Sequence, residues 1–274
     1  MAAGFALWAM VLFLPATAVR AADALFPRPL HITRELSDPV SQKTTRIDEY
    51  CHGNRIVSVS GMRTAIADYA KGELTEIDFA AGTYSVTKFE SIARVHEKNA
   101  PRVDRAAAST ARNEWRVQSL GGSVIASRPA ETTEVESDAD GSRRVIRISS
   151  DRQLTMSRAA VEAVMGIGYP HRTDSSADVV LSALRVRAPR IANNAAGADT
   201  ADVYGLPLEH VVRAGVGGEM VETRNVVVRL GDELPPLDVL SIPPGAKLVE
   251  SKAVAAQRLL EELDRPPSRS NGND

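Results

Sequence analysis

Residues 29 to 89 mix apolar and polar side chains in about six short β-type runs, which cover 29–36, 44–50, 55–59, 64–69, 73–78 and 83–87. Glycines at positions 53, 61, 72 and 82 stand between the later runs. Glycine readily adopts the positive φ that tight hairpin turns require, so each glycine marks an expected turn. The pattern predicts an antiparallel sheet built from hairpins.

A helix and a second set of strands are expected after residue 88. Phe89, Ile92, Ala93 and His96 have the spacing of one helical face, and residues 100–113 form a polar, alanine-rich connector. Strand patterns return at 114–120, 124–126, 132–136 and 143–149, with turns expected at 121–122 and 140–141. The clearest hairpin has strands at 207–214 and 219–230 around the glycine-rich residues 215–218.

Two short helices with apolar stripes are predicted after this second set of strands. Ser157 can cap the first, which ends near Gly166, and the second follows Asp174. We expect the stripes to press on the sheet and to form an apolar lid. The candidate ligand-binding residues are Val161, Val164, Met165, Val180, Leu181 and Leu184. Residues 188–201 form a mobile linker or a weakly patterned helix, and a last helix is expected after Ser251.

The N-terminus has the pattern of a secretory signal peptide. An apolar stretch from Phe5 to Leu14 precedes Pro15 and small residues that end at Ala21, a plausible cleavage position. The stretch is much shorter than the ~20 residues that span a bilayer, although a membrane anchor is the alternative. We therefore predict a signal peptide at 1–21, one domain at 22–264, a disordered tail at 265–274, and no membrane span in the mature chain.

Composition narrows the choice of partners. Removal of residues 1–21 leaves 32 of the 33 basic residues against 35 acidic ones, so nothing in the charge recruits nucleic acid. Aromatic residues make up 4% of the chain, and Trp115 is the only tryptophan after residue 21, which disfavours a sugar-stacking platform. Cys51 is the only cysteine, so no disulfide can form within the chain.

No motif in the sequence indicates catalysis, a metal or a cofactor. The five histidines are scattered, Cys51 lacks the ligand set of a zinc site, and no Gly-x-Ser-x-Gly elbow is present. Acidic residues in the first sheet could do acid–base chemistry, but a solvated outer face explains them more simply. These residues are Asp38, Asp48, Glu49, Asp68, Glu76 and Asp78. We expect no enzyme activity.

The C-terminal part of the chain resembles the end of the periplasmic outer-membrane lipoprotein carrier family. The C-terminal arrangement consists of Gly205-Leu-Pro-Leu208, a hairpin, and Leu237-Asp-Val-Leu-Ser-Ile-Pro-Pro-Gly-Ala-Lys247. The opening half resembles exported bacterial domains of unknown function with the same fold, through residues 53–55, 68–69, 73–78 and 83–87. Together the two segments cover most of residues 28–250.

The resemblance implies an α+β fold, in which helices cover a strongly curved antiparallel sheet or incomplete β-barrel. It also implies a periplasmic or secreted carrier that holds a lipid or a lipoprotein acyl chain between sheet and helices. The alternative is a protein-interaction or sensor module whose core is filled and whose outer edge or loop docks an envelope protein partner. An apolar cavity of roughly 300 Å³ or more would favour the carrier.

Overall fold

The computed structural model describes residues 24–39, 42–99, 115–139, 142–166, 175–186, 202–216, 219–251 and 254–255. The signal-peptide segment, both connectors, the expected C-terminal helix beyond residue 255 and the tail lie outside this part of the chain. The first half contains β1 (Phe26–Asp38), β2 (Lys43–Gly53), β3 (Arg55–Ser60), β4 (Arg63–Asp68), β5 (Glu73–Asp78), β6 (Thr83–Lys88) and α1 (Phe89–Asn99).

The second half begins with the three strands β7 (Arg116–Ile125), β8 (Arg128–Ala139) and β9 (Ser142–Ser157). The helices α3 (Arg158–Val164) and α4 (Ser175–Leu184) follow. The remaining elements are β10 (Arg185–Val186), β11 (Val203–Val216), β12 (Glu219–Gly231), the short 3-10 helix η2 (Leu237–Leu240) and β13 (Lys247–Leu248).

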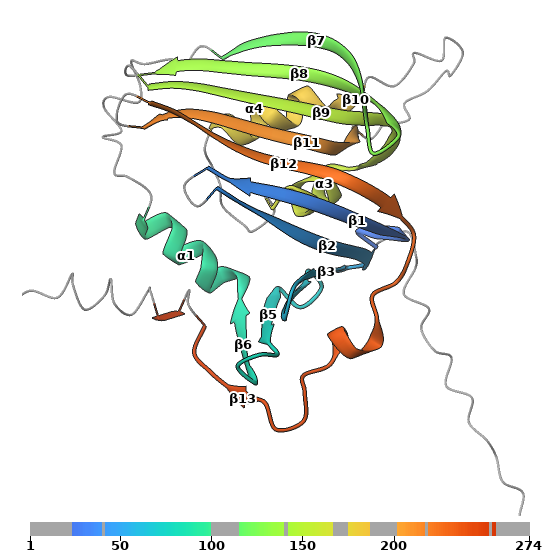
Figure 1. The fold of residues 1–274 in the computed structure, drawn as a ribbon, viewed down its shortest axis with the longest axis vertical. Coiled ribbons are helices and arrows are strands. Elements are labelled where there is room, and N and C mark those ends of the chain that lie inside the picture. Colours follow the sequence, from blue (N-terminus) through green and yellow to red (C-terminus); the bar gives the residue numbers. More distant parts are fainter. Residues whose placement is uncertain are drawn as a thin grey trace, which may run out of the picture.

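All strands belong to one open sheet with the order β13-β6-β5-β4-β3-β2-β1-β12-β11-β9-β8-β7, and β10 pairs with β11 (Figure 1). The expected α+β class, an incomplete barrel covered by helices, is therefore wrong. The described chain is mainly β, and its three described α-helices are short. Strands β8, β9, β11 and β12 contain 12 to 16 residues because hydrogen bonding continues through polar positions beyond the apolar runs.

The six predicted strands of the first half are confirmed as β1 to β6, and their glycine turns have positive φ. One predicted turn is wrong. Gly121 and Gly122 lie inside β7, where the register against β8 shifts between Ser119 and Gly121. The positive φ of Gly121 produces a bulge that lets one strand continue past the glycine pair.

Helices α3 and α4 pack on one face of the sheet, over β9 and β11 (Figure 1). The Ser157 hydroxyl accepts a hydrogen bond from the Ala160 N–H at 3.2 Å, which confirms the predicted N-cap of α3. Under α3, buried residues of β1, β2, β3, β11 and β12 form one apolar cluster. Under α4, residues of β8, β9 and β11 form a second cluster.

Residues 232–251, which we call the C-terminal strap, run from the end of β12 to the opposite edge of the β1–β6 half (Figure 1). There β13 pairs in parallel with β6, with Lys247 opposite Thr83 and Leu248 opposite Tyr84. The strap therefore covers the β6 edge of the sheet with backbone hydrogen bonds.

Candidate functional site

The six predicted lid residues lie where α3 and α4 meet the sheet. Val161, Met165, Val180, Leu181 and Leu184 belong to the cluster under α4, and Val164 belongs to the cluster under α3. All except the half-buried Met165 are at most 6% exposed. They line neither of the two larger hollows that we find on the described surface. That they contact a ligand stays a prediction.

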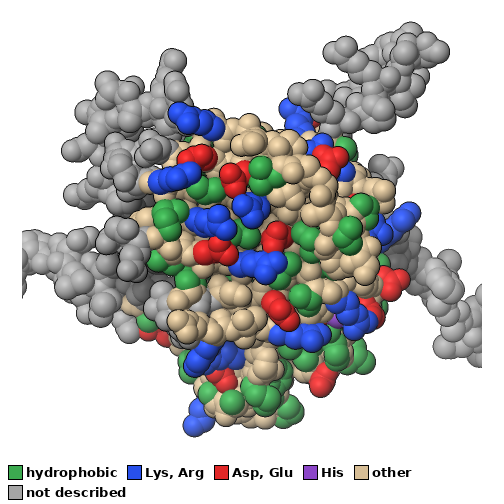
Figure 2. All heavy atoms as spheres, turned by 45° about the horizontal axis from the view of Figure 1, so that its top comes forward, with side chains coloured by type: hydrophobic (Ala, Val, Ile, Leu, Met, Phe, Trp, Pro, Cys, Tyr) green, Lys and Arg blue, Asp and Glu red, His purple; other side chains and the backbone are tan. Residues whose placement is uncertain are grey.

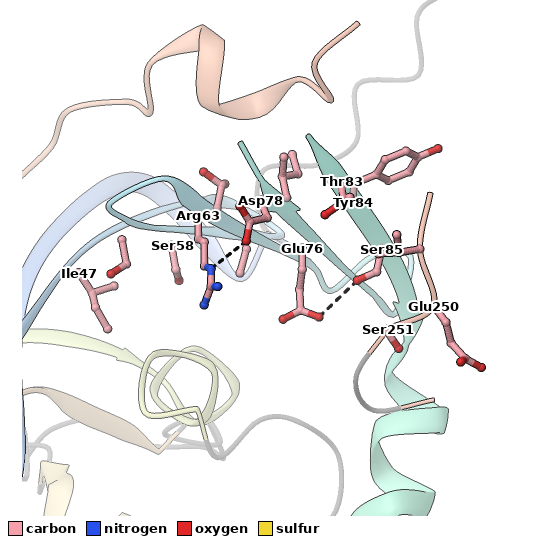
Figure 3. A pocket seen from close by; sticks show the side chains of 15 residues that line it. Ile47, Ser58, Arg63, Glu76, Asp78, Thr83, Tyr84, Ser85, Glu250 and Ser251 are labelled. Atoms are coloured by element: carbon pink, nitrogen blue, oxygen red, sulfur yellow. Dashed lines mark hydrogen bonds and ion pairs between the residues drawn. The ribbon is translucent and has the colours of Figure 1, made fainter. Parts of the chain in front are cut away.

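The first of these two hollows has a volume of about 340 Å³ and lies against β3 to β6 (Figure 3). Two rows of side chains cross these strands, because directly opposed residues in an antiparallel sheet point to the same face. The register gives one row as Ser58, Ala65, Glu76 and Ser85, and the other as Ser60, Arg63, Asp78 and Thr83. All eight residues line the hollow, which we call the hydroxyl groove.

The strap closes one side of the hydroxyl groove. Val249, Glu250 and Ser251 line it next to β6, and Figure 3 shows Glu250 and Ser251 on that side. There the Val249 N–H donates to the Tyr84 carbonyl at 2.8 Å. Ser251 is only 4% exposed. The groove thus has a floor of sheet residues and a wall that belongs to the C-terminal strap.

Three charged groups of the hydroxyl groove, Arg63, Glu76 and Asp78, have partners within it. Asp78 accepts hydrogen bonds from the Ala81 N–H at 2.9 Å and from Arg63 Nε at 3.1 Å. The Ala81 N–H, aided by Arg63, holds the pKa of Asp78 below its usual range. The Ser85 hydroxyl donates to Glu76 at 3.4 Å. The groove therefore offers hydroxyls and carboxylates and suits a polar ligand better than an acyl chain.

The predicted cluster of acidic residues is divided between the two faces of the sheet. Glu76 and Asp78 line the hydroxyl groove, Glu49 pairs with the buried Arg34 at 2.7 Å, and Asp68 pairs with Arg55 at 2.8 Å. Asp48 lies 3.2 Å from His31. The prediction of a single solvated outer face is therefore wrong, since alternation along each strand places neighbouring acids on opposite sides.

Strand β7 forms the other end of the sheet, and no described strand pairs with its outer edge. Nine of its ten residues are exposed, and the tenth is half-buried. Val117, Leu120 and Val124 are 55%, 44% and 75% exposed. A second hollow of about 390 Å³ lies beside the β7–β8 hairpin, lined by residues that include Val124, Pro129, Glu131 and Arg152.

The sheet face opposite α3 and α4 carries paired charges. Figure 2 shows Lys and Arg side chains interleaved with Asp and Glu on this side of the molecule. Cross-strand ion pairs join Arg143 to Glu136, Arg147 to Glu134, Arg213 to Glu222 and Arg224 to Glu209. Because each charge has a partner of opposite sign, this face carries no field of one sign that would attract a highly charged ligand.

The sequence analysis predicted neither the unpaired outer edge of β7 nor the position of His31 beside Asp48 and Tyr50. The signal for the edge was weak, because the Gly121-Gly122 pair reads as a turn. The signal for His31 was the alternation of His31 and Thr33 against Asp48 and Tyr50, which only the register of β1 and β2 brings together. Within the described residues, no group of three or more His, Cys, Asp or Glu could hold a metal ion, and no helix could cross a membrane.

Comparison with known proteins assigns no family. No family model matches the sequence, so the resemblance to the lipoprotein carriers has no support from a family model, and no curated protein matches it. A structure of PNGF-II has a TM-score of 0.36 at 9% identity, over 86% of this chain and 33% of that one. A MucB structure has a TM-score of 0.35 at 15% identity, over 83% of this chain and 61% of that one.

The Pseudomonas aeruginosa MucA/MucB complex has a TM-score of 0.34 at 14% identity, over 78% of this chain and 55% of that one. This chain therefore spans between one third and about three fifths of the length of these solved chains. With TM-scores below 0.5, the similarities assign neither a fold family nor a function to it.

Proposed function

We propose that this chain is an exported, non-enzymatic protein-interaction module that binds an extended segment of an envelope protein along β7. The observation that carries the proposal is the exposed outer edge of this ten-residue strand. Such an edge presents unpaired backbone N–H and C=O groups, onto which another strand can be added. Export rests on the apolar segment from Phe5 to Leu14, which lies outside the described residues.

The two ends of the sheet support a specific use of β7. At one end, the strap covers the β6 edge with β13. At the other, β7 has neither Lys nor Pro, which commonly protect an edge, and Arg116 is its only charged residue. The bulge at Gly121 is the one protective feature we find there. Within the part of the chain that the structure describes, one edge is covered by the C-terminal strap and the other has no partner strand.

Side chains around β7 indicate the chemistry of the bound segment. An added strand presents every second side chain to each face, so the hollow beside Val124 can take one apolar side chain of the partner. Val117 and Leu120 offer further apolar contact. We therefore expect a partner segment that is extended, largely uncharged and apolar at alternate positions.

The lipid carrier is the less favoured of the two expectations. Its lid residues are buried in packed clusters, and the hollow of about 340 Å³ is lined mainly by residues with polar side chains. An acyl chain gains free energy by leaving water for an apolar cavity, which these linings do not provide.

Site-specific cross-linking in the native host tests the proposal. A photoreactive residue at Val124 should form an adduct with one envelope protein. The matched control is the same residue at Val228, which is 40% exposed on the interior strand β12 and should give none. The adduct identifies the partner for a direct test with both purified proteins.

In that direct test, hydrogen exchange should show new protection of backbone amides in β7 when the partner segment is added. Protection confined to another surface would contradict the proposal. So would a concentration-dependent dimer in which β7 of one copy pairs with β7 of another, because the edge would then serve self-association.

A further inference from the structure

One row of residues at the β7 edge faces the second hollow, which we call the edge hollow. The register pairs Gly122 with Glu131 and Val124 with Pro129, and residues two apart on a strand point to the same side. All four residues line the edge hollow, together with Arg152 of β9. Because β7 is the last described strand at this end of the sheet, a strand added to it would lie directly beside this row.

Gly122 leaves the floor of the edge hollow bare. A Cβ atom built on Gly122 has only the Ala130 carbonyl oxygen within 4 Å, at 3.9 Å. The neighbouring Gly121 needs to be glycine for its φ of 94°, but Gly122 has no positive φ. Backbone conformation therefore does not explain this second glycine. A glycine inside a strand often marks a place where a ligand or another chain approaches closely.

The walls of the edge hollow combine apolar surface with a planar cation. Val124 is 75% exposed, and Pro129 is exposed beside it. Arg152 Nε lies 2.7 Å from Glu131 Oε2, and its side chain is still 36% exposed. The ion pair places the guanidinium at the hollow, and a guanidinium stacks on aromatic rings.

The size of the edge hollow favours a large side chain. Its volume is about 390 Å³. A cavity of roughly 150 Å³ already accommodates benzene, so a small aliphatic side chain would leave most of the space unfilled. Aromatic side chains bring more apolar area than aliphatic ones, and an aromatic ring on one strand characteristically covers a glycine on the next. Only an aromatic ring also gains from contact with the Arg152 guanidinium.

We propose that the edge hollow is a specificity pocket for one aromatic side chain, Phe, Tyr or Trp, of the strand that β7 binds. Gly122 forms its floor, Val124 and Pro129 form its walls, and Arg152 stacks on the ring. The inference rests on the proposed function, since only a strand added to β7 brings a side chain to this place. It goes further by naming the residue type that the partner must carry.

The geometry of an added strand limits the aromatic residue to one position. In an antiparallel pair, the residue directly opposite Gly122 points to the same face as Gly122 and so enters the edge hollow. Its two neighbours in sequence point to the other face, where no comparable glycine lies. The partner segment should therefore contain a single required aromatic residue among positions that tolerate substitution.

Three synthetic peptides test the pocket with the purified full chain. Each is an extended segment of alternating Thr and Val, and they differ only in carrying Phe, Leu or Ala at the central position. Hydrogen exchange should show that all three protect the amides of β7. Titration followed by NMR should show that the Phe peptide binds about tenfold or more tightly than the Ala peptide, with the Leu peptide between them.

Two variants locate the preference for Phe in the edge hollow. Gly122→Val fills the floor and leaves the backbone edge of β7 intact, so it should lower the affinity for the Phe peptide to that for the Ala peptide. Arg152→Met keeps an apolar wall and removes the cation, so it should reduce the preference only partly. The matched control is Ser119→Val, an exposed β7 position outside the hollow, which should bind all three peptides like the parent chain.

The outcomes separate this inference from the proposed function. If all three peptides protected β7 and bound equally, strand addition would stand and the aromatic pocket would be overturned. A preference for Phe that survived in Gly122→Val would place the ring elsewhere and would also overturn it. If no peptide protected β7, both the proposed function and the pocket would fail.

Discussion

One face of the sheet carries buried apolar side chains in one half of the molecule and polar side chains in the other. Under α3 and α4 it carries side chains such as Ile32, Ile148 and Leu206, each at most 1% exposed. Beyond Ile56, the face continues along β3 to Ser58 and Ser60, and the next strands add Arg63, Glu76 and Asp78. We call these the helix-covered half and the groove half.

The difference shows what covers each half. Helices bring apolar stripes and exclude water, so the sheet beneath them must be apolar. The strap borders the groove half as one segment that contains only the short 3-10 helix η2 and few buried side chains, and the sheet residues beside it keep hydroxyl and charged groups. Stability should therefore reside in the helix-covered half, whereas the groove half can change its cover at low cost.

The largest expected effect is in the helix-covered half. Leu184→Ala removes a fully buried side chain from the cluster under α4 and should lower the free energy of unfolding by about 2–5 kcal/mol, measured by urea denaturation. Leu237→Ala, in the exposed middle of the strap, is the matched control and should change it by no more than about 0.5 kcal/mol. Similar losses in both variants would remove the distinction between the halves.

A second substitution tests whether the helix-covered half holds a cavity. Val164→Trp overfills a packed cluster and should lower the free energy of unfolding by about 1–3 kcal/mol or more. The parent chain should take up no fluorescent fatty acid. If the parent bound the probe and Val164→Trp abolished binding while the melting temperature held, the helices would form the lid that the carrier hypothesis requires.

Local patterns predicted the groove half better than the arrangement of the whole sheet. Short hairpins are set by residues close in sequence, and β5 spans the predicted residues 73–78 without change. The neighbours β1 and β12 are nearly two hundred residues apart, and no local signal indicates that they pair. The C-terminal end of β9 was missed for a related reason, since the residues that follow Ser149 are mostly polar, and several of them pair with β11.

The candidate site was less predictable than the strands, because it depends on register. Glu76 and Asp78 were identified as acidic residues, but only the pairing of β4, β5 and β6 places them beside Ser85 and Thr83. The contact of His31 with Glu233 joins the two ends of the described chain. The apolar stripes of the helices were easier to predict from the sequence. The three-residue spacing of Val161 and Val164 by itself puts both side chains on one face of a single helix.

Substitution of Cys51, at the border of the two halves, should have a smaller effect on the free energy of unfolding. It is 1% exposed in the cluster under α3, and burial raises the pKa of its thiol, so it is a poor nucleophile at neutral pH. Cys51→Ser buries a hydroxyl in apolar surroundings and should cost about 1–3 kcal/mol of stability. Partner binding at β7 should not change in the folded variant, and its selective loss would give Cys51 a functional role.

The smallest expected effect concerns Asp78, and it tests whether the hydroxyl groove keeps its charges without help from a ligand or the strap. The pKa of Asp78 lies below its usual range mainly because of the Ala81 N–H, and Arg63 contributes less. A carboxylate with a lowered pKa stabilises the fold above its ordinary pKa, and the contribution is lost as pH falls through the lowered value. Carbon NMR should therefore show that Arg63→Gln raises the pKa of Asp78 only partly toward the usual value. Arg55→Gln, which leaves Asp78 and its turn untouched, should leave that pKa unchanged. A full return to the ordinary value in Arg63→Gln would mean that the ion pair across β4 and β5, and not the turn, fixes the charge in the groove half.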